Sequence, residues 1–79
     1  MSPFISQTVE VPTRVLRFRV IASNLSVKIE DASWVIRPTV DVLEQLESGR
    51  IEVRDGIIDW EFKRPKLLHC YEIHWRIGV

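Results

Sequence analysis

Apolar and polar residues alternate along several stretches of this chain, and this period of two is typical of half-buried β-strands. The alternation over 14–22 is regular, with apolar side chains on the even positions and arginines on the other face. A weaker alternation over 5–11 predicts an edge strand, because Pro12 cannot donate a hydrogen bond to a strand ladder. We expect residues 25–30 to form another strand that pairs with 14–22 as a hairpin.

The dipeptide Asp55-Gly56 lies between two alternating runs and indicates a two-residue type I′ turn. A hairpin closed by this turn puts apolar residues opposite one another on one face. It also sets Glu52 directly opposite Asp59, where like charges repel. The longest alternation, over 67–79, predicts a last strand that follows this hairpin as a meander.

A short helix is predicted over 39–48, where apolar residues gather on one side of a helical projection. Thr39 suits the N-cap, Asp41 suits the positive end of the helix dipole, and Gly49 is placed to cap the carboxyl end. The predicted fold class is therefore α+β, with one domain over 1–79. It has a mostly antiparallel β-sheet of about five strands and one short helix packed on one face, in the order ββ(β)αβββ.

Length and cysteine content restrict the class of protein further. A chain of 79 residues is near the lower limit for independent folding, and Cys70 is its single cysteine, so no disulfide within the chain stabilises it. The first residues lack the basic start and apolar run of a signal peptide, and no apolar stretch is long enough to span a bilayer. We expect a soluble, cytoplasmic protein without a membrane partner.

Charged residues are balanced in number but unevenly placed. Eleven basic and eleven acidic side chains give a formal net charge of zero. Segment 11–29 carries only basic charges, whereas acidic residues dominate 30–61. A bipolar, near-neutral chain tends to associate with itself or with a partner. The interpretation that we favour is that opposite charges meet across neighbouring strands.

Cys70, Glu72 and His74 share one face of the predicted last strand and are the first candidates for metal or thiol chemistry. Same-face neighbours in a strand lie about 6.7 Å apart, so the thiol and the imidazole of His74 are roughly 13 Å from each other. A zinc site or a nucleophile–base pair needs much shorter separations. His69 falls on the apolar face, where we expect a hydrogen-bonded core histidine.

The predicted pair Glu52 and Asp59 could hold a cation or act as an acid–base pair. A solvated acidic face, neutralised by Arg50 and Arg54, is the preferred interpretation, and a docking surface for a basic partner is another. The sequence has no glycine-rich phosphate loop, nucleophile elbow or zinc-type spacing. We therefore predict no catalytic residues, no metal and no cofactor. A hydrolase or metalloenzyme is the third and weakest hypothesis.

The remaining hypothesis is a non-enzymatic protein-binding domain: a small regulator, inhibitor or accessory subunit that occludes or bridges a partner surface. The partner is a larger protein or a second copy, which would form a homodimer through a sheet edge. The predicted acidic binding surface comprises Asp41, Glu44, Glu47, Glu52 and Asp59.

The alternative is a small module for RNA or single-stranded DNA. Such a module would use strand-borne basic residues together with aromatic rings. The basic surface for this alternative comprises Arg17, Arg19, Lys63, Arg64 and Lys66.

Overall fold

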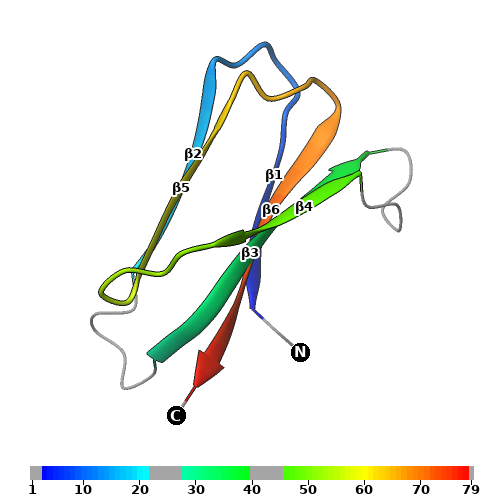
Figure 1. The fold of residues 1–79 in the computed structure, drawn as a ribbon. Helices are drawn as coiled ribbons and strands as arrows, with labels where there is room; N and C mark the ends of the chain where they lie inside the picture. Colours follow the sequence, from blue (N-terminus) through cyan, green and yellow to red (C-terminus); the bar gives the residue numbers. More distant parts are fainter. Residues whose placement is uncertain (1–2, 22–27, 40–45, 79) are drawn as a thin grey trace.

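The computed structural model describes residues 3–21, 28–39 and 46–78, and these form a sandwich of two antiparallel β-sheets. The strand order is β1-β6-β3-β4 in the larger sheet and β2-β5 in the smaller one (Figure 1). The described part of the chain contains no helix. The strands are β1 (Phe4–Thr8), β2 (Val15–Ile21), β3 (Lys28–Pro38), β4 (Glu47–Ile51), β5 (Ile57–Lys63) and β6 (His69–Gly78).

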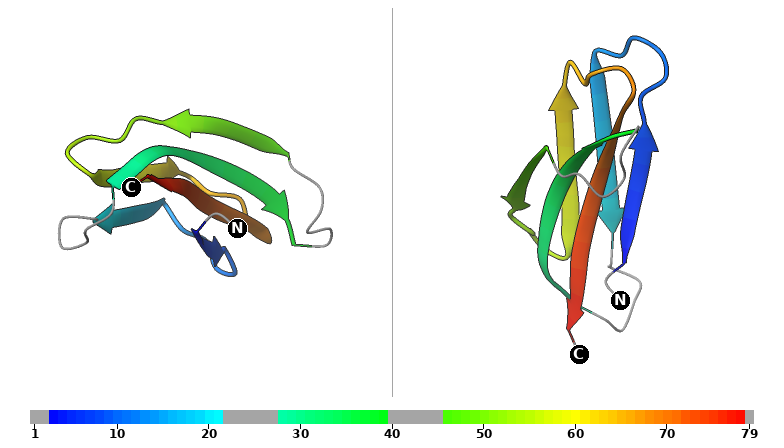
Figure 2. Two further views of the ribbon diagram at one scale, coloured as in Figure 1. Left: turned by 90° about the horizontal axis from the view of Figure 1, so that it is seen from below. Right: turned by 90° about the vertical axis from the view of Figure 1, so that its right-hand side faces the viewer.

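The hydrophobic core fills the space between the two sheets. Figure 2 shows the arrangement of these sheets from two further directions. Phe18 and Ile58 reach the core from the smaller sheet, and Tyr71 and Ile73 reach it from the central strand β6. Ile58 and Ile73 are fully buried. Because alternate residues of a strand point to opposite faces, each strand gives one set of side chains to the core and one to solvent.

The predicted α+β class is wrong, and the predicted helix is the reason. Glu47 and Ser48, which the helix was expected to include, lie in β4 instead, and the amide of Leu46 donates a hydrogen bond to the carbonyl of Ile36. The amide and hydroxyl of Thr39, the predicted N-cap, donate hydrogen bonds to the carbonyl of Leu68, and positions 40–45 lie outside the described residues. Pairing of β4 with β3 overrides the helical pattern, because tertiary contacts outweigh weak local propensity.

Three predicted strand pairings are also wrong. β2 does not pair with β3, and β5 does not pair with β6. β6 instead lies between β1 and β3, so the last strand is central. The two strands that flank Asp55-Gly56 separate after one bridge, between Arg54 and Ile57, and enter different sheets. Glu52 consequently does not face Asp59, whose partner in the ladder is Arg19.

Several local predictions are confirmed. β1 is an edge strand, β2 alternates as expected over 15–21, and β6 occupies most of the predicted last strand. Asp55 and Gly56 both have positive φ, of 54° and 72°, which is the backbone signature of a type I′ turn. The expectation that opposite charges meet across strands is also confirmed, since Arg76 contacts Asp31 at 2.7 Å between β6 and β3.

Gly49 has a different role from the predicted helix cap. It lies in β4 directly opposite Trp34 of β3. A Cβ atom at this position would come within 2.6 Å of Cε2 and Nε1 of the Trp34 indole. The absence of a side chain therefore allows the indole to lie flat over the β4 backbone.

Candidate functional site

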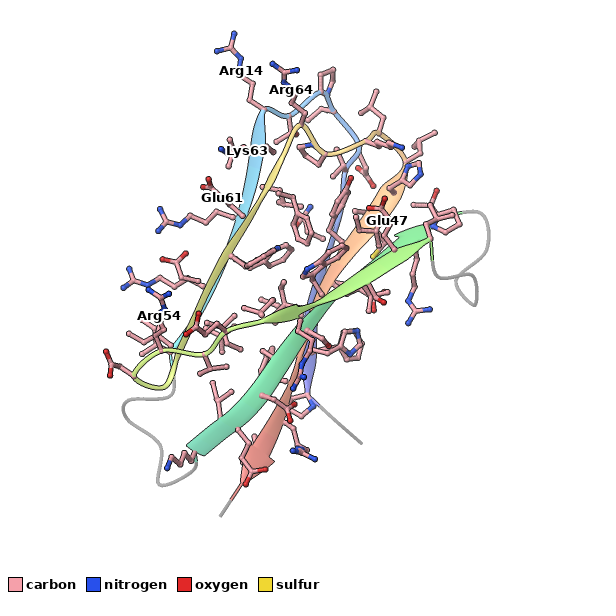
Figure 3. All side chains as sticks on the ribbon, viewed as in Figure 1. Arg14, Glu47, Arg54, Glu61, Lys63 and Arg64 are labelled. Carbon is pink, nitrogen blue, oxygen red and sulfur yellow. The ribbon has the colours of Figure 1, made fainter. Side chains whose placement is uncertain are left out.

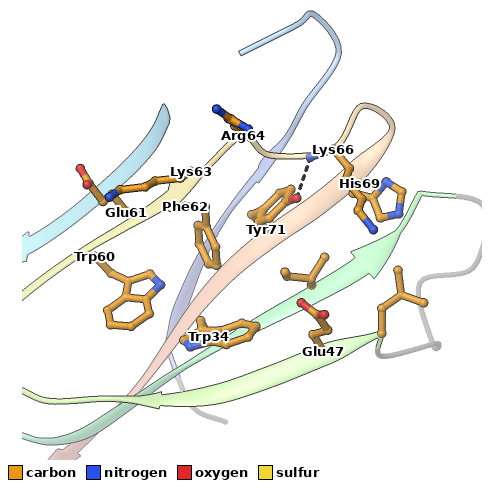
Figure 4. Close-up of a pocket in the computed structure, with 12 residues that line it drawn as sticks. Trp34, Glu47, Trp60, Glu61, Phe62, Lys63, Arg64, Lys66, His69 and Tyr71 are labelled. Atoms are coloured by element: carbon orange, nitrogen blue, oxygen red, sulfur yellow. Dashed lines mark hydrogen bonds between the residues drawn. The ribbon is translucent and has the colours of Figure 1, made fainter. Parts of the chain in front are cut away.

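A cleft of about 470 Å³ opens between β4 and β5, where the two strands diverge into different sheets (Figure 4). This volume lies within the range of small-ligand sites. The strands β4 and β5 diverge from the Asp55-Gly56 turn toward the connection between β5 and β6 (Figure 1). Its lining consists of Trp34, Ile36, Leu46, Glu47, Trp60, Glu61, Phe62, Lys63, Arg64, Lys66, His69 and Tyr71.

Aromatic rings form the floor of this cleft and contact one another. The indoles of Trp34 and Trp60 stack at a centroid distance of 6.5 Å and an interplanar angle of 17°. Phe62 packs edge-on against Trp34 at 5.7 Å and contacts Tyr71 at 4.7 Å. The Tyr71 hydroxyl accepts a hydrogen bond from the backbone amide of Lys66, at 2.8 Å, which fixes the ring against the β5–β6 connection. Trp34, Trp60 and Phe62 are only half-buried, so the cluster is open on the cleft side.

Trp60 leaves one hydrogen bond unmade. Its Nε1 is buried and has no acceptor among the described residues. An unpaired buried donor costs about 1–3 kcal/mol, so most buried indole N–H groups have a partner. The packing of this cluster is therefore not optimised for stability alone.

The charges on the rim are unequally distributed along the cleft. Lys63 ends β5, and Arg64 and Lys66 follow it in the β5–β6 connection. None of these three cations has an ion-pair partner within 4 Å among the described residues. Glu47 lies across the cleft on β4 (Figure 3). The end nearest the β5–β6 connection is therefore basic.

β5 has a free main-chain edge beside the cleft. In an antiparallel ladder, alternate residues direct both main-chain polar groups to the partner strand. The amide of Arg64 bonds to the carbonyl of Arg14, continuing the β2–β5 register, whereas both polar groups of Ile57 bond to Arg54 on the opposite side. The N–H and C=O groups that point away from β2 are therefore those of Asp59, Glu61 and Lys63. Among the described residues no strand pairs with them.

The described members of the predicted acidic surface do not form one patch. Glu47 lies on the cleft, and Asp41 and Glu44 are outside the described residues. Glu52 and Asp59 line a separate shallow depression beside the type I′ turn. They are joined to cations there, Glu52 to Arg54 at 3.2 Å and Asp59 to Arg17.

The Arg17–Asp59 pair is a bidentate cross-strand ion pair, with nitrogen–oxygen distances of 2.9 and 2.7 Å. The hydrogen bonds from Arg17 are the main cause that lowers the pKa of Asp59 below the usual 3.8; desolvation opposes them, and the positive charges of Arg17 and then Arg19 lower the pKa further. The same contact raises the pKa of Arg17. The guanidinium of Arg17 is therefore already paired with an acidic side chain.

The predicted basic surface is divided in the same way. Arg19 lies beside the depression that contains Glu52 and Asp59. Lys63, Arg64 and Lys66 lie together on the cleft. The basic surface predicted as one site is therefore two.

Glu72 organises a polar cluster on the outer face of the larger sheet. The residue is only 8 % exposed, and its carboxylate contacts Nε2 of His74 at 2.7 Å and Nε of Arg37 at 3.1 Å. The Cys70 thiol lies 3.9 Å from the same carboxylate. Phe4 stacks on the His74 ring at 5.0 Å. Arg37 supplies a positive charge to this buried acid, and the residues that the structure describes include no cluster of ligands suited to a metal ion.

His69 lines the cleft, and its Nδ1 lies 2.8 Å from the carbonyl oxygen of Leu67. The sequence predicts a hydrogen-bonded core histidine at this position. The contact with the Leu67 carbonyl is present, but His69 lies on the cleft and outside the core cluster. The sequence pattern does not identify the cleft itself. Phe62 was not singled out, and Trp34 was considered only as one of several rings available to a nucleic acid, because the cleft exists only where β4 and β5 enter different sheets. The signal that was available is the spacing of Trp60 and Phe62 on one face of β5, beside the basic run 63–66.

Comparisons with protein-family models, with curated proteins and with solved structures found no match to this chain. No helix in the described segments is long and apolar enough to cross a membrane.

Proposed function

We propose that this chain is a non-enzymatic protein-binding domain that captures an extended segment of another polypeptide along the free edge of β5. The observation that carries the proposal is the coincidence of that edge with the aromatic cleft. The edge offers main-chain donors and acceptors at Asp59, Glu61 and Lys63. The cleft beside it offers apolar volume for side chains. Strand addition uses both, with main-chain bonds for affinity and pockets for specificity.

The geometry of a ladder determines which side chains of the bound segment would enter the cleft. Cross-strand neighbours share a face of the sheet. Residues of the added strand that lie opposite Trp60 and Phe62 would therefore point toward the interior, against the open aromatic floor. An added strand would also cover the half-buried rings, in a sandwich whose smaller sheet has only two strands against four. Covering apolar area in this way is worth about 25 cal/mol per Å² before the costs of association.

A nucleic-acid module is the competing candidate, because three of the predicted cations gather beside aromatic rings. Two observations favour a polypeptide. Trp34 and Trp60 stack on each other, which leaves those faces unavailable to bases. A nucleic acid would in addition leave the main-chain N–H and C=O groups of the β5 edge without hydrogen bonds to a neighbouring strand.

The test is selection of binders from a random peptide library displayed on phage, followed by affinity measurements on two variants of Glu61. Glu61→Pro removes the central edge amide, which does not bond to β2, so the β2–β5 ladder stays intact. Glu61→Ala removes the same side chain and keeps the amide. We expect selected peptides to bind the alanine variant like the parent and to lose at least roughly tenfold in affinity for the proline variant.

A second measurement covers the case in which Glu61→Pro does not fold. N-methylation of alternate amides in a selected peptide removes the same hydrogen bonds from the ligand side and leaves the domain unchanged. Binding should fall when the methylated amides are those that face β5. It should persist when the methylated amides are those that face away from β5. Peptides that bind equally well with both methylation patterns, or a folded parent from which no peptide is selected, would contradict strand addition.

A further inference from the structure

We infer that the captured segment is acidic at its amino-terminal end, with an aromatic or large apolar side chain following it. This inference rests on the proposed function and names the chemistry of its ligand. The acidic end would lie against Lys63, Arg64 and Lys66, and the apolar side chain would enter the cleft.

The three cations provide the charge complementarity. They are consecutive around one end of the cleft, exposed, and without an ion-pair partner among the described residues. Elsewhere in this neutral chain, Arg17, Arg54 and Arg76 have acidic partners. Cations grouped in one place and left unpaired favour an anionic partner, mainly by steering it and by excluding basic competitors.

Strand direction determines which end of the segment is acidic. β5 runs from Ile57 toward Lys63, so the basic group lies at its carboxyl end. The two-stranded sheet is antiparallel, and antiparallel pairing is slightly the more stable arrangement. A segment added antiparallel to β5 therefore begins beside the basic group and continues along the cleft.

The backbone of Arg64 supports a role for its side chain. Arg64 has φ of 53°, a left-handed conformation that glycine adopts at lower cost. The conformation is held by the hydrogen bond from its amide to the carbonyl of Arg14, at 2.7 Å. An arginine kept at this position carries strain that a glycine would not, and such strain tends to persist at binding sites.

The experiment compares fluorescent peptides that share an alternating valine–threonine core with a central phenylalanine. One has an aspartate run at its amino-terminal end, one at its carboxyl end, and one has serines instead. We expect the first to bind roughly tenfold more tightly than the serine peptide at low salt, from several exposed ion pairs, and to lose this advantage at high salt. The second should resemble the serine peptide.

Two substitutions on the rim of the cleft test the same inference, because they should change the affinity for the first peptide in opposite directions. Arg64→Gly should weaken binding of the first peptide without loss of fold stability, because glycine relieves the left-handed conformation. Glu47→Gln should strengthen binding of that peptide. The serine peptide carries no charge at that end, so either substitution should change its affinity less than that of the first peptide.

The outcomes separate this inference from the proposed function. Equal, salt-independent binding of all three peptides overturns the inference and leaves strand capture intact. A preference for the carboxyl-terminal aspartate run also overturns it, because the segment then runs parallel to β5. If a single-stranded oligonucleotide of matched charge binds more tightly than every peptide, and Glu61→Pro does not weaken it, both proposals fail.

Discussion

The indole of Trp34 occupies the space that a side chain at position 49 would need, so one glycine determines the shape of the cleft floor. Trp34 contacts both Trp60 and Phe62. Any displacement of its ring is therefore transmitted to the whole aromatic cluster. At the scale of single residues, the cleft depends on this close approach more than on any polar contact.

We predict that Gly49→Ala destabilises the fold by about 1–3 kcal/mol, because the new methyl group forces the indole away from β4. Chemical denaturation measures the loss, and tryptophan fluorescence of the folded protein should shift because the ring moves. Gly56→Ala is the matched control. Its Cβ meets nothing within 4 Å, but φ of 72° makes alanine unfavourable there. The control should lose stability while its native fluorescence stays unchanged, and identical fluorescence in both variants would contradict the role of Gly49.

Glu72 presents a second residue-scale prediction. Glu72→Gln removes the charge of a buried carboxylate and so weakens its hydrogen bonds with Arg37 and His74. We expect a loss of about 2 kcal/mol in the free energy of unfolding, measured by urea denaturation. Glu52→Gln is the control, because its pair with Arg54 is largely exposed and should contribute little. Equal losses in the two variants would show that burial of Glu72 is unimportant.

At the scale of elements, the pairing of β2 with β5 depends on a core face and on the exposed Arg17–Asp59 pair of the other face. Because the pKa of Asp59 is lowered in the folded chain, its carboxylate binds a proton less readily there than in the unfolded chain. The stabilisation that the Arg17–Asp59 pair contributes is therefore complete above the usual carboxyl pKa of 3.8. It is lost as the pH falls through the lower pKa that Asp59 has in the folded chain.

The corresponding prediction compares the parent with Asp59→Asn as a function of pH. The parent should be the more stable near neutral pH, and the two stabilities should converge below about pH 4 as Asp59 becomes protonated. Denaturation curves recorded from neutral pH to about pH 2 test this. A stability difference that grows in acid would contradict the direction of the Asp59 pKa shift.

The elements also show how far the sequence determines this fold. Alternation predicted β2 and β6 because each buries one face, and Asp55-Gly56 predicted its turn because positive φ is required at both positions. Which strands pair was not predictable in the same way. Alternation indicates which face of a strand is buried but not which neighbour covers it. The helical pattern was wrong at Glu47 and Ser48 for a related reason, since the pairing of β4 with β3 is a contact between segments distant in the sequence.

At the scale of the whole molecule, the unequal sheets explain why a binding site forms at all. Four strands face two, so the inner face near β4 is incompletely covered, and the cleft is the result. The individual components of the site were visible in the sequence as Trp60, Phe62 and the basic run that follows. Their assembly was not, because it depends on β4 and β5 separating after a single bridge.

The most direct test of strand capture is residue-resolved amide hydrogen exchange along β5, without and with the peptide that carries the amino-terminal aspartate run. In the free protein we predict fast exchange at Asp59, Glu61 and Lys63, and slow exchange at Trp60 and Phe62, which bond to β2. Bound peptide should slow exchange at the three edge amides. Edge amides that are already protected in the free protein, or that stay unprotected when the peptide is bound, would contradict the account.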